Sequence, residues 1–250
     1  MIKIILCAYN EEQNLNKLLT DLISDLKLLQ RDFEIIFCLD CTTDNSSSVI
    51  ERFAKDCKIT ILPQDNIRGL GRAYKKIFLH LLLNCNDDDL IISLDADNTH
   101  NTSQIQSMME YFEKNSLDFL IASRFFEKSL ISSFPLHRKL ISKLTSLILQ
   151  KLFAVKNINQ QNILDYTSGY RIYKGKILKE IYKKYNDNFI LEPEFTYTCE
   201  LLIKISRLAF RIDEIPILYN YKNKIGASKM RILQNLYRLI LMIFNLKFQK

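Results

Sequence analysis

The first half of the chain alternates between short apolar runs and longer segments with helical spacing, and this alternation constrains the fold most. Buried strands are predicted from apolar, β-branched runs at residues 2–8, 33–39, 58–62, 90–94 and 119–122. Helices are predicted between them at residues 11–29, 44–56, 69–83 and 102–114. Buried strands joined by helices form right-handed βαβ units, so we predict a Rossmann-like α/β fold with a mostly parallel sheet flanked by helices.

The second half is less regular, but no repeat, low-complexity segment or linker interrupts it. Helices are predicted at residues 136–153, 177–185, 195–206 and 230–248. Strand-like segments lie at residues 166–173 and 210–219, and Pro216 marks the second as an edge strand because proline cannot donate to a ladder. We therefore predict one domain over residues 1–229, followed by an amphipathic helix over 230–250 that contacts a membrane surface or a second copy of the chain.

Polar residues directly follow the predicted strands, where ligands of parallel sheets bind. They are Tyr9-Asn10-Glu11, Asp40, Asp65-Asn66, Asp95-Ala-Asp97 and Ser123-Arg124. The sharpest signal is the pair Asp95 and Asp97, because two carboxylates beyond one strand can both reach a hard divalent cation. Mg²⁺ accepts one or two protein carboxylates and takes its remaining ligands from water and substrate phosphates. A polar cap of the strand end is the alternative interpretation.

Two further features near these strand ends suggest a nucleotide. Asp40 is placed to accept a hydrogen bond from a base N–H or a ribose hydroxyl, or else to cap a helix together with Asp44. Gly69 and Gly71 open the next helix, where glycines allow an anion to approach the backbone closely. Their spacing matches neither G-x-G-x-x-G nor a Walker A loop, so this signal is weak by itself.

The net charge of +7 is concentrated in two stretches that contain no acidic residue. Residues 128–164 hold six basic residues, and residues 215–250 hold seven. This distribution predicts an anionic partner, which is a phosphate group, a nucleic acid or an anionic membrane. Because no RNP, helix-turn-helix or zinc-finger pattern is present, we do not expect nucleic acid to be the partner.

The sequence also bears on the compartment. The apolar run at residues 2–8 is too short for a signal-peptide core, and the run Leu239–Phe244 is too short to span a bilayer. We therefore expect a cytoplasmic protein, soluble or bound to a membrane surface. In a reducing cytosol the six cysteines would stay free, and Cys38 and Cys41 would pack in or beside a strand.

Taken together, eight motifs in chain order resemble the family 2 glycosyltransferases, and within them the dolichol- or polyprenyl-phosphate sugar synthases. The motifs are Ala8-Tyr-Asn-Glu11, Asp40-Cys-Thr-Thr-Asp44, Gly69-Leu-Gly-Arg-Ala73, Asp95-Ala-Asp97, Ser123-Arg124, Thr167-Ser-Gly-Tyr-Arg171, Glu214-Ile-Pro-Ile217 and Gly226-Ala-Ser-Lys229. The resemblance covers roughly residues 2–231. It implies the GT-A fold, a UDP- or GDP-linked sugar donor, Mg²⁺ or Mn²⁺, and inversion at the anomeric carbon.

The resemblance also implies roles for individual residues. The metal would be held by Asp95 and Asp97, and Asp97 and Arg124 would be catalytic. The nucleotide-sugar would be bound by Ala8, Tyr9, Asn10, Glu11, Asp40, Gly69, Arg72, Asp95 and Ala96. The acceptor phosphate would be bound by Arg124, Arg138, Ser142, Lys224 and Lys229. The chain departs from the pattern at Leu39, Thr99 and Asn223, where an Asp, a metal-binding Gln and an Arg are usual.

Two acceptor classes follow from the chemistry. A polyprenyl phosphate is already anionic, so it needs cations that position it and no general base, and the acid-free basic stretches supply cations. A hydroxyl acceptor, as in polysaccharide or glycolipid synthesis, needs a carboxylate base, for which Glu192, Glu194 and Glu200 are available. Of these three, we predict Glu200 as a catalytic residue, and a charge on the helix face is the alternative interpretation. We predict the first class, with the protein peripheral on the cytoplasmic membrane face. A non-catalytic sugar-nucleotide binder is a further alternative.

Overall fold

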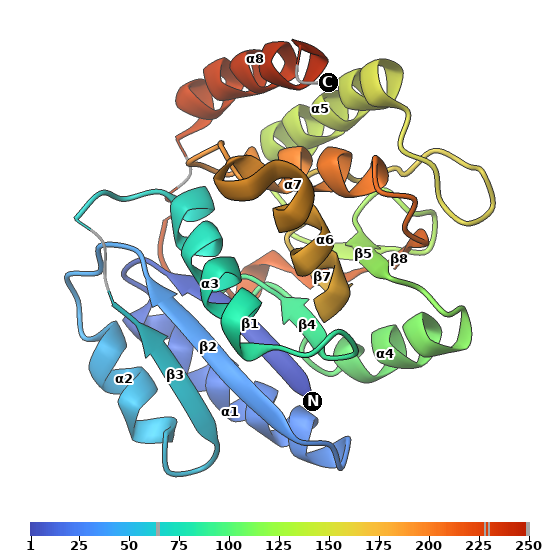
Figure 1. The fold of residues 1–250 in the computed structure, drawn as a ribbon. Helices are drawn as coiled ribbons and strands as arrows, with labels where there is room; N and C mark the ends of the chain where they lie inside the picture. The colour runs from blue at the N-terminus through green and yellow to red at the C-terminus, as the bar shows by residue number, and fades with distance from the viewer. Residues whose placement is uncertain (64–65, 228, 230, 249–250) are drawn as a thin grey trace.

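The computed structural model describes residues 1–63, 66–227, 229 and 231–248. A seven-stranded sheet in the order β3-β2-β1-β4-β7-β5-β8 forms its centre (Figure 1). The strands are β1 (Ile2–Ala8), β2 (Phe33–Leu39), β3 (Lys58–Leu62), β4 (Leu90–Ser93), β5 (Phe119–Ser123), β7 (Arg171–Lys174) and β8 (Ile212–Pro216). All of them are parallel except β7, which runs antiparallel to both β4 and β5. The predicted α/β fold is thus confirmed.

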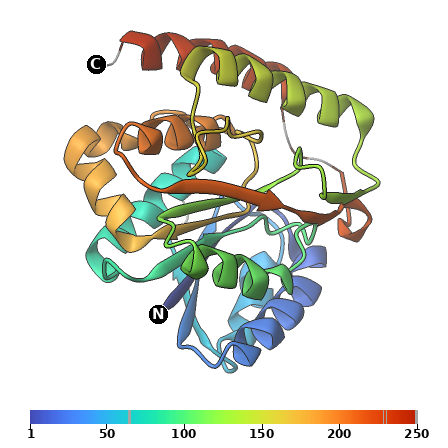
Figure 2. The same cartoon turned by 90° about the vertical axis from the view of Figure 1, so that its right-hand side faces the viewer.

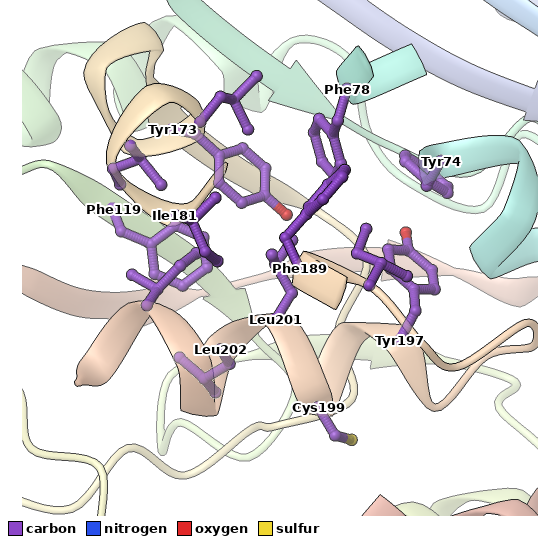
Figure 3. Packing of buried hydrophobic residues seen from close by; sticks show 14 of the residues in the cluster. Tyr74, Phe78, Phe119, Tyr173, Ile181, Phe189, Tyr197, Cys199, Leu201 and Leu202 are labelled. Atoms are coloured by element: carbon purple, nitrogen blue, oxygen red, sulfur yellow. The ribbon is translucent and has the colours of Figure 1, made fainter. Parts of the chain in front are cut away.

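Helices cover both faces of this sheet. The helices are α1 (Glu12–Leu28), α2 (Ser46–Phe53), α3 (Leu70–Asn84), α4 (Gln104–Lys114), α5 (Leu136–Phe153), α6 (Gly175–Tyr185), α7 (Tyr197–Ser206) and α8 (Ile232–Phe248). The apolar residues of α1, α2 and α4 pack into one buried cluster, and those of α3, α6 and α7 pack into another. Figure 3 shows part of the second cluster, where the Tyr74 and Tyr197 rings stack with centroids 4.7 Å apart.

The first five strands lie where the sequence predicts them. Four of them are apolar runs whose side chains are buried on both sheet faces, whereas β3 at the sheet edge is mostly half-buried. Pro216 also ends an edge strand as predicted, since β8 is the last strand of the sheet. Strand β7 is shorter than the predicted 166–173. The first residues of the predicted segment belong to a turn instead, because the buried Asp165 accepts hydrogen bonds from the backbone N–H groups of Thr167 and Ser168.

Helices α5 and α8 lie side by side on the outside of the molecule (Figures 1 and 2). Only Ser146 and Leu149 of α5 are buried, so most of its apolar side chains face outward. A small parallel sheet pairs β6 (Leu130–Ser132) with β9 (Leu218–Asn220). Along the chain, β6 comes between β5 and α5, and β9 comes between β8 and α8. Neither strand has a strong signal in the sequence. The predicted residues Asp65, Ser228 and Met230 lie outside the described residues.

Candidate active site

A cleft opens beyond the carboxyl ends of β1, β2 and β4 and continues between α5 and α8. The sequence-predicted residues on its wall are Ala8, Tyr9, Glu11, Asp40, Asp95, Ala96, Asp97, Arg124, Arg138, Ser142, Lys224 and Lys229. Parallel strands place their ends at one edge, which is why residues from β1, β2 and β4 converge. The cleft wall that the structure describes does not include Asn10, Gly69, Arg72 or Glu200.

The end of β1 provides a flat aromatic surface in the cleft. The Arg68 guanidinium lies 3.6 Å from the centre of the Tyr9 ring, in cation–π contact. The neighbouring Glu11 is buried, and its carboxylate is 2.7 Å from Lys229 Nζ. Burial raises the pKa of Glu11, and the contact with Lys229 opposes that shift. Because Lys229 also donates to the Tyr9 and Asn10 carbonyls, the structure places it at the donor end and not with Arg138.

The glycine pair has a different role from the one that the sequence suggests. A Cβ on Gly69 would lie 2.5 Å from the Pro193 carbonyl oxygen, and one on Gly71 would lie 2.0 Å from that of Glu192. The glycines therefore let α3 pack against the chain before α7. The Gly69 N–H donates to Asp40 Oδ1 at 2.8 Å, so Asp40 anchors the start of α3 while it lines the cleft.

Asn10 and Arg72 also act beside the cleft. Asn10 adopts φ 54°, a left-handed conformation that Asn tolerates, and its side chain binds the backbone N–H and the hydroxyl of Thr43. This contact joins the loops that follow β1 and β2. Arg72 is exposed and donates to the Arg68 carbonyl. Neither residue lines the described cleft wall, where the sequence-predicted nucleotide contact would lie.

The carboxylate pair lies on the loop after β4. The Asp95 side chain is about a third exposed, and its Oδ2 is 3.8 Å from Nε2 of the buried His100. His100 Nδ1 accepts a hydrogen bond from the Asp95 N–H, and burial between Tyr170 and Tyr219 lowers the pKa of its imidazole. His100 was not predicted from the sequence as a site residue. Its position, three residues after Asp97, is the signal that could have found it.

Asp97 is engaged at both oxygens. Its Oδ2 is 2.5 Å from Lys224 Nζ, and its Oδ1 accepts a hydrogen bond from the Thr99 hydroxyl at 2.6 Å. Burial works against the charge of Asp97, but Lys224 and Thr99 hold the pKa of this carboxyl below its ordinary value. Lys224, expected at the acceptor phosphate, is thus paired with Asp97.

The two aspartates fit a divalent cation only together with a substrate. The described residues contain no group of three or more His, Cys, Asp and Glu side chains that would hold a metal unaided. Mg²⁺ commonly needs only one or two carboxylates when phosphates complete its shell. A Cβ on Gly169 would lie 3.1 Å from Asp95 Oδ1, so glycine is what leaves space beside this carboxylate.

The part of the cleft that contains Arg124 and Thr167 is organised by Asp165, a residue not predicted from the sequence. This fully buried carboxylate binds Nε and the Nη2 group of Arg124 at 2.8 and 2.9 Å. Arg124 also donates to the Thr167 hydroxyl, which lies 2.5 Å from Ser142 Oγ. Arg138 donates to the Tyr221 hydroxyl at 3.1 Å. Arg124, Arg138 and Ser142 are therefore brought together, as expected, but the charge of Arg124 is already paired.

Glu200 is the one expected catalytic residue that the structure removes from the cleft. It is buried in α7, where it pairs with Lys204 at 2.5 Å and accepts the backbone N–H groups of Leu191 and Glu192. The Glu200 carboxylate thereby holds the loop before α7 in place, and it does not face the cleft. Glu194, from the same group of carboxylates, does line the cleft, and burial raises its pKa.

Solved structures share this architecture. Glucosyl-3-phosphoglycerate synthase from Mycobacterium tuberculosis, solved with Mn²⁺, UDP and phosphoglyceric acid, superimposes with a TM-score of 0.62 at 16% identity. The match covers 98% of this chain and 78% of that one. S. aureus TarS residues 1–349 with UDP gives a TM-score of 0.60 at 16% identity over 97% of this chain, which spans only 64% of that structure. The fold is therefore the GT-A fold of glycosyltransferases.

The sequence model of glycosyl transferase family 2 matches residues 3–182. The chain belongs to this family of glycosyltransferases. It is 26% identical over 227 residues to the undecaprenyl-phosphate mannosyltransferase of Micrococcus luteus, covering 90% of this chain and 86% of that protein. It is 25% identical to the dolichol-phosphate mannosyltransferase of Pyrococcus furiosus, covering 96% of this chain and 63% of that protein.

Proposed function

We propose that this glycosyltransferase moves a sugar from a UDP- or GDP-linked donor to a polyprenyl phosphate, with inversion at the anomeric carbon. The observation that carries the proposal is the shape of the cleft. It joins the carboxylates beyond β4 to Arg138 and Ser142, and it then continues between α5 and α8 past Leu236 and Leu239. One cavity therefore offers acidic, basic and apolar surroundings in the order that a nucleotide, a phosphate and a hydrocarbon chain require.

At the donor end, Tyr9 and Arg68 offer a stacked surface for the base, and Asp40 offers a carboxylate oxygen for a hydroxyl or a base N–H. Asp95 and Asp97 would hold Mg²⁺ or Mn²⁺ against the diphosphate. Bound there, the cation would neutralise charge on the leaving nucleoside diphosphate. Metal dependence is part of this proposal.

At the acceptor end, a phosphate oxygen of the lipid attacks the anomeric carbon as the bond to the donor diphosphate breaks. The electron pair of that bond leaves with the nucleoside diphosphate. The configuration inverts because the phosphate oxygen attacks from the face opposite the leaving group. The nucleophile carries its own negative charge, which removes the need for a general base. Arg138, with Ser142 and Thr167, would hold this phosphate, and Arg124 would keep Thr167 in place.

The outer face of α5 and α8 fits the surface of an anionic membrane. Large apolar side chains exposed on α5 are Leu136, Leu140, Leu144, Leu147, Ile148 and Leu152. Those exposed on α8 are Leu233, Leu236, Tyr237, Ile240, Phe244 and Phe248. Basic residues accompany them, and each adds about 1 kcal/mol of attraction near anionic lipid. Among the helices of the described chain, none combines the length and hydropathy needed to cross a bilayer.

One observation favours a hydroxyl acceptor as the second candidate. Glu194 lies on the cleft wall with its pKa raised by burial, so it is a better-placed general base than Glu200. The substitution Glu194→Gln separates the two functions. A polyprenyl-phosphate acceptor predicts near-normal transfer in this variant, whereas a hydroxyl acceptor predicts its loss.

The test starts with isothermal titration of UDP and GDP, each with Mn²⁺ and with EDTA. We expect one nucleotide to bind in a metal-dependent way. The donor sugars of that nucleotide are then tried with polyprenyl phosphate and with polyprenol, in vesicles that contain anionic lipid. Transfer to the phosphate alone supports the proposal, and transfer only to the alcohol contradicts it. Absence of binding by either nucleotide would favour a non-catalytic protein.

A further inference from the structure

Lys224 contacts one of the two carboxylates that the proposed function assigns to a divalent cation. Its ammonium group lies 2.5 Å from Asp97 Oδ2, and the exposed fractions of the two side chains are only 8% and 15%. The ion pair is therefore largely shielded from bulk solvent. The other oxygen of Asp97 already accepts the Thr99 hydroxyl. A metal ion that approaches Asp97 therefore meets a carboxylate whose two oxygens are both engaged.

The backbone around Lys224 holds the ammonium group in this place. Tyr221–Asn223 form a short 3-10 turn, and the Lys224 N–H donates to the Tyr221 carbonyl. The next residue, Ile225, exchanges hydrogen bonds with the buried Asn14 of α1: its N–H donates to Asn14 Oδ1 at 2.8 Å, and its carbonyl accepts from Asn14 Nδ2 at 3.0 Å. The turn is thus fixed to the donor side of the molecule. These hydrogen bonds hold the backbone next to Lys224, so the contact of Lys224 with Asp97 is part of the folded site and not a contact of a mobile surface side chain.

We propose that Lys224 is a resident counter-ion of Asp97, which a divalent cation must displace when the nucleotide-sugar binds. The inference rests on the proposed function, because it assumes a metal at Asp95 and Asp97. Two cations cannot share one carboxylate oxygen at ion-pair distance without strong repulsion. The site therefore exists in two states: a state with Lys224 on Asp97 and a state with the metal on Asp97.

This exchange has a consequence for how metal and donor binding are coupled. Metal binding alone must break a shielded ion pair, which lowers its affinity. Metal that arrives with a diphosphate gains phosphate ligands, and the released ammonium group gains an anionic partner in the cleft. The pair Lys224 and Asp97 therefore disfavours the metal without the donor. Lys224 is a positioning residue in this scheme, since it acts through Asp97.

The direct test measures the affinity for Mn²⁺ itself, by electron paramagnetic resonance of the free ion, in the wild type and in Lys224→Met. Removal of the competing ammonium should tighten Mn²⁺ binding about tenfold in the absence of nucleotide. The control Lys222→Met removes an exposed lysine from the same turn and should bind Mn²⁺ as the wild type does. The double variant Asp97→Asn with Lys224→Met should lose the gain.

A merely structural role for Lys224 predicts the opposite, because a loosened site binds metal more weakly. Equal or weaker Mn²⁺ binding by a folded Lys224→Met protein overturns the inference. This failure differs from a failure of the proposed function. If UDP and GDP both fail to bind the wild type but Lys224→Met still tightens Mn²⁺ binding, the counter-ion exchange stands and the donor assignment falls.

Hydrogen exchange supplies a second readout that does not depend on metal affinity. The Ile225 amide is protected by Asn14 as long as the turn stays in place. Saturating Mn²⁺ with the bound nucleotide should change the exchange of residues 222–225 in the wild type by several fold. In Lys224→Met the same addition should change it much less. Identical responses in the two proteins would contradict a displacement of Lys224.

Discussion

The two ends of the cleft, to which the proposed function assigns the donor and the acceptor, are built in different ways. At the donor end, Tyr9, Asp40 and Asp95 follow strands directly, so the register of a buried sheet places them. At the acceptor end, Arg124 and Thr167 are placed by the buried carboxylate of Asp165, and Arg138 lies on a helix that is mostly exposed. The first arrangement depends on the backbone and the second on a few charged side chains. The difference predicts which substitutions impair chemistry alone and which also impair folding.

The largest effect is expected from Asp97→Ala, which tests the donor end. The carboxylate carries the proposed metal contact, so transfer should fall about 1,000-fold. The protein should stay folded, although the loss of the ion pair with Lys224 should lower its stability, by less than Asp165→Asn does because Asp97 is partly exposed and Asp165 is not. Initial rates with donor and polyprenyl phosphate, together with a thermal melt, measure both quantities. Asp88→Ala, an exposed change before β4, is the control. A loss of less than tenfold would remove Asp97 from the catalytic machinery.

Asp165→Asn tests the acceptor end and should mainly affect stability. It leaves the shielded Arg124 guanidinium without its charged partner, so the free energy of unfolding should fall by about 3 kcal/mol. Urea denaturation measures this change. The exposed pair Lys17 and Asp21 offers the comparison, since Asp21→Asn should cost less than about 0.5 kcal/mol. Equal effects of the two variants would show that Asp165 does not anchor this region.

Arg138→Ala should separate the two ends functionally. The half-buried guanidinium contacts the hydroxyl of Tyr221, a side chain that packs at the margin of one buried cluster and is not part of its interior. Transfer to polyprenyl phosphate should fall about 100-fold, equivalent to roughly 2.7 kcal/mol, with nucleotide binding nearly intact. Kinetics in both substrates and nucleotide titration test this, with exposed Lys139→Ala as the control. Unchanged turnover would exclude Arg138 from acceptor binding.

The smallest effect concerns pH. Glu214 accepts the backbone N–H groups of Leu164 and Asp165, and burial raises its pKa to about 7. An unfolded glutamate has a pKa of about 4.3, so the folded state binds the extra proton between these values. Its stabilising contribution is present at low pH and is lost as the pH rises, by about 2 kcal/mol between pH 5 and pH 7.

Glu214→Gln should therefore flatten the fall in the free energy of unfolding across this range. Because other buried groups titrate as well, the quantity to compare is the difference between wild type and variant at each pH. The exposed Glu180→Gln on α6 should leave the wild-type profile unchanged. A constant difference from pH 5 to pH 7 would mean that Glu214 does not titrate in this window.

The same contrast explains what could be predicted from the sequence. The strand-end rule located Tyr9, Asp40 and Asp95 because a parallel sheet converts chain order into position. The rule does not predict the position of Lys224, because that position depends on the hydrogen bonds between Ile225 and Asn14, which are 211 residues apart in the sequence. Asp165 was not predicted as a site residue because the apolar spacing of the residues that follow it, around Tyr166 and Tyr170, resembles that of a strand. The contacts that pull Thr167 and Ser168 into a turn carry no periodic signal.

Glycines and carboxylates show a further limit. Gly69 and Gly71 suggested an anion site because only the helix start is visible in the sequence, whereas their close contacts are with residues 192–193. Glu200 and Glu194 are indistinguishable in the sequence as candidate bases. Tertiary packing alone decides that one binds Lys204 in the interior and the other lines the cleft.

The turn before β7 has a consequence for how the parts of the cleft are held together. Ser93 donates to the Gly169 carbonyl and Ser168 donates to that of Ala122, each at 2.7 Å, so the turn is fastened to the ends of both β4 and β5. The position of Thr167 relative to the carboxylates after β4 is then set by the rigid sheet. Because Thr167 also contacts Ser142 at 2.5 Å, the same turn ties α5 to that sheet, and a movement of α5 would have to break this contact.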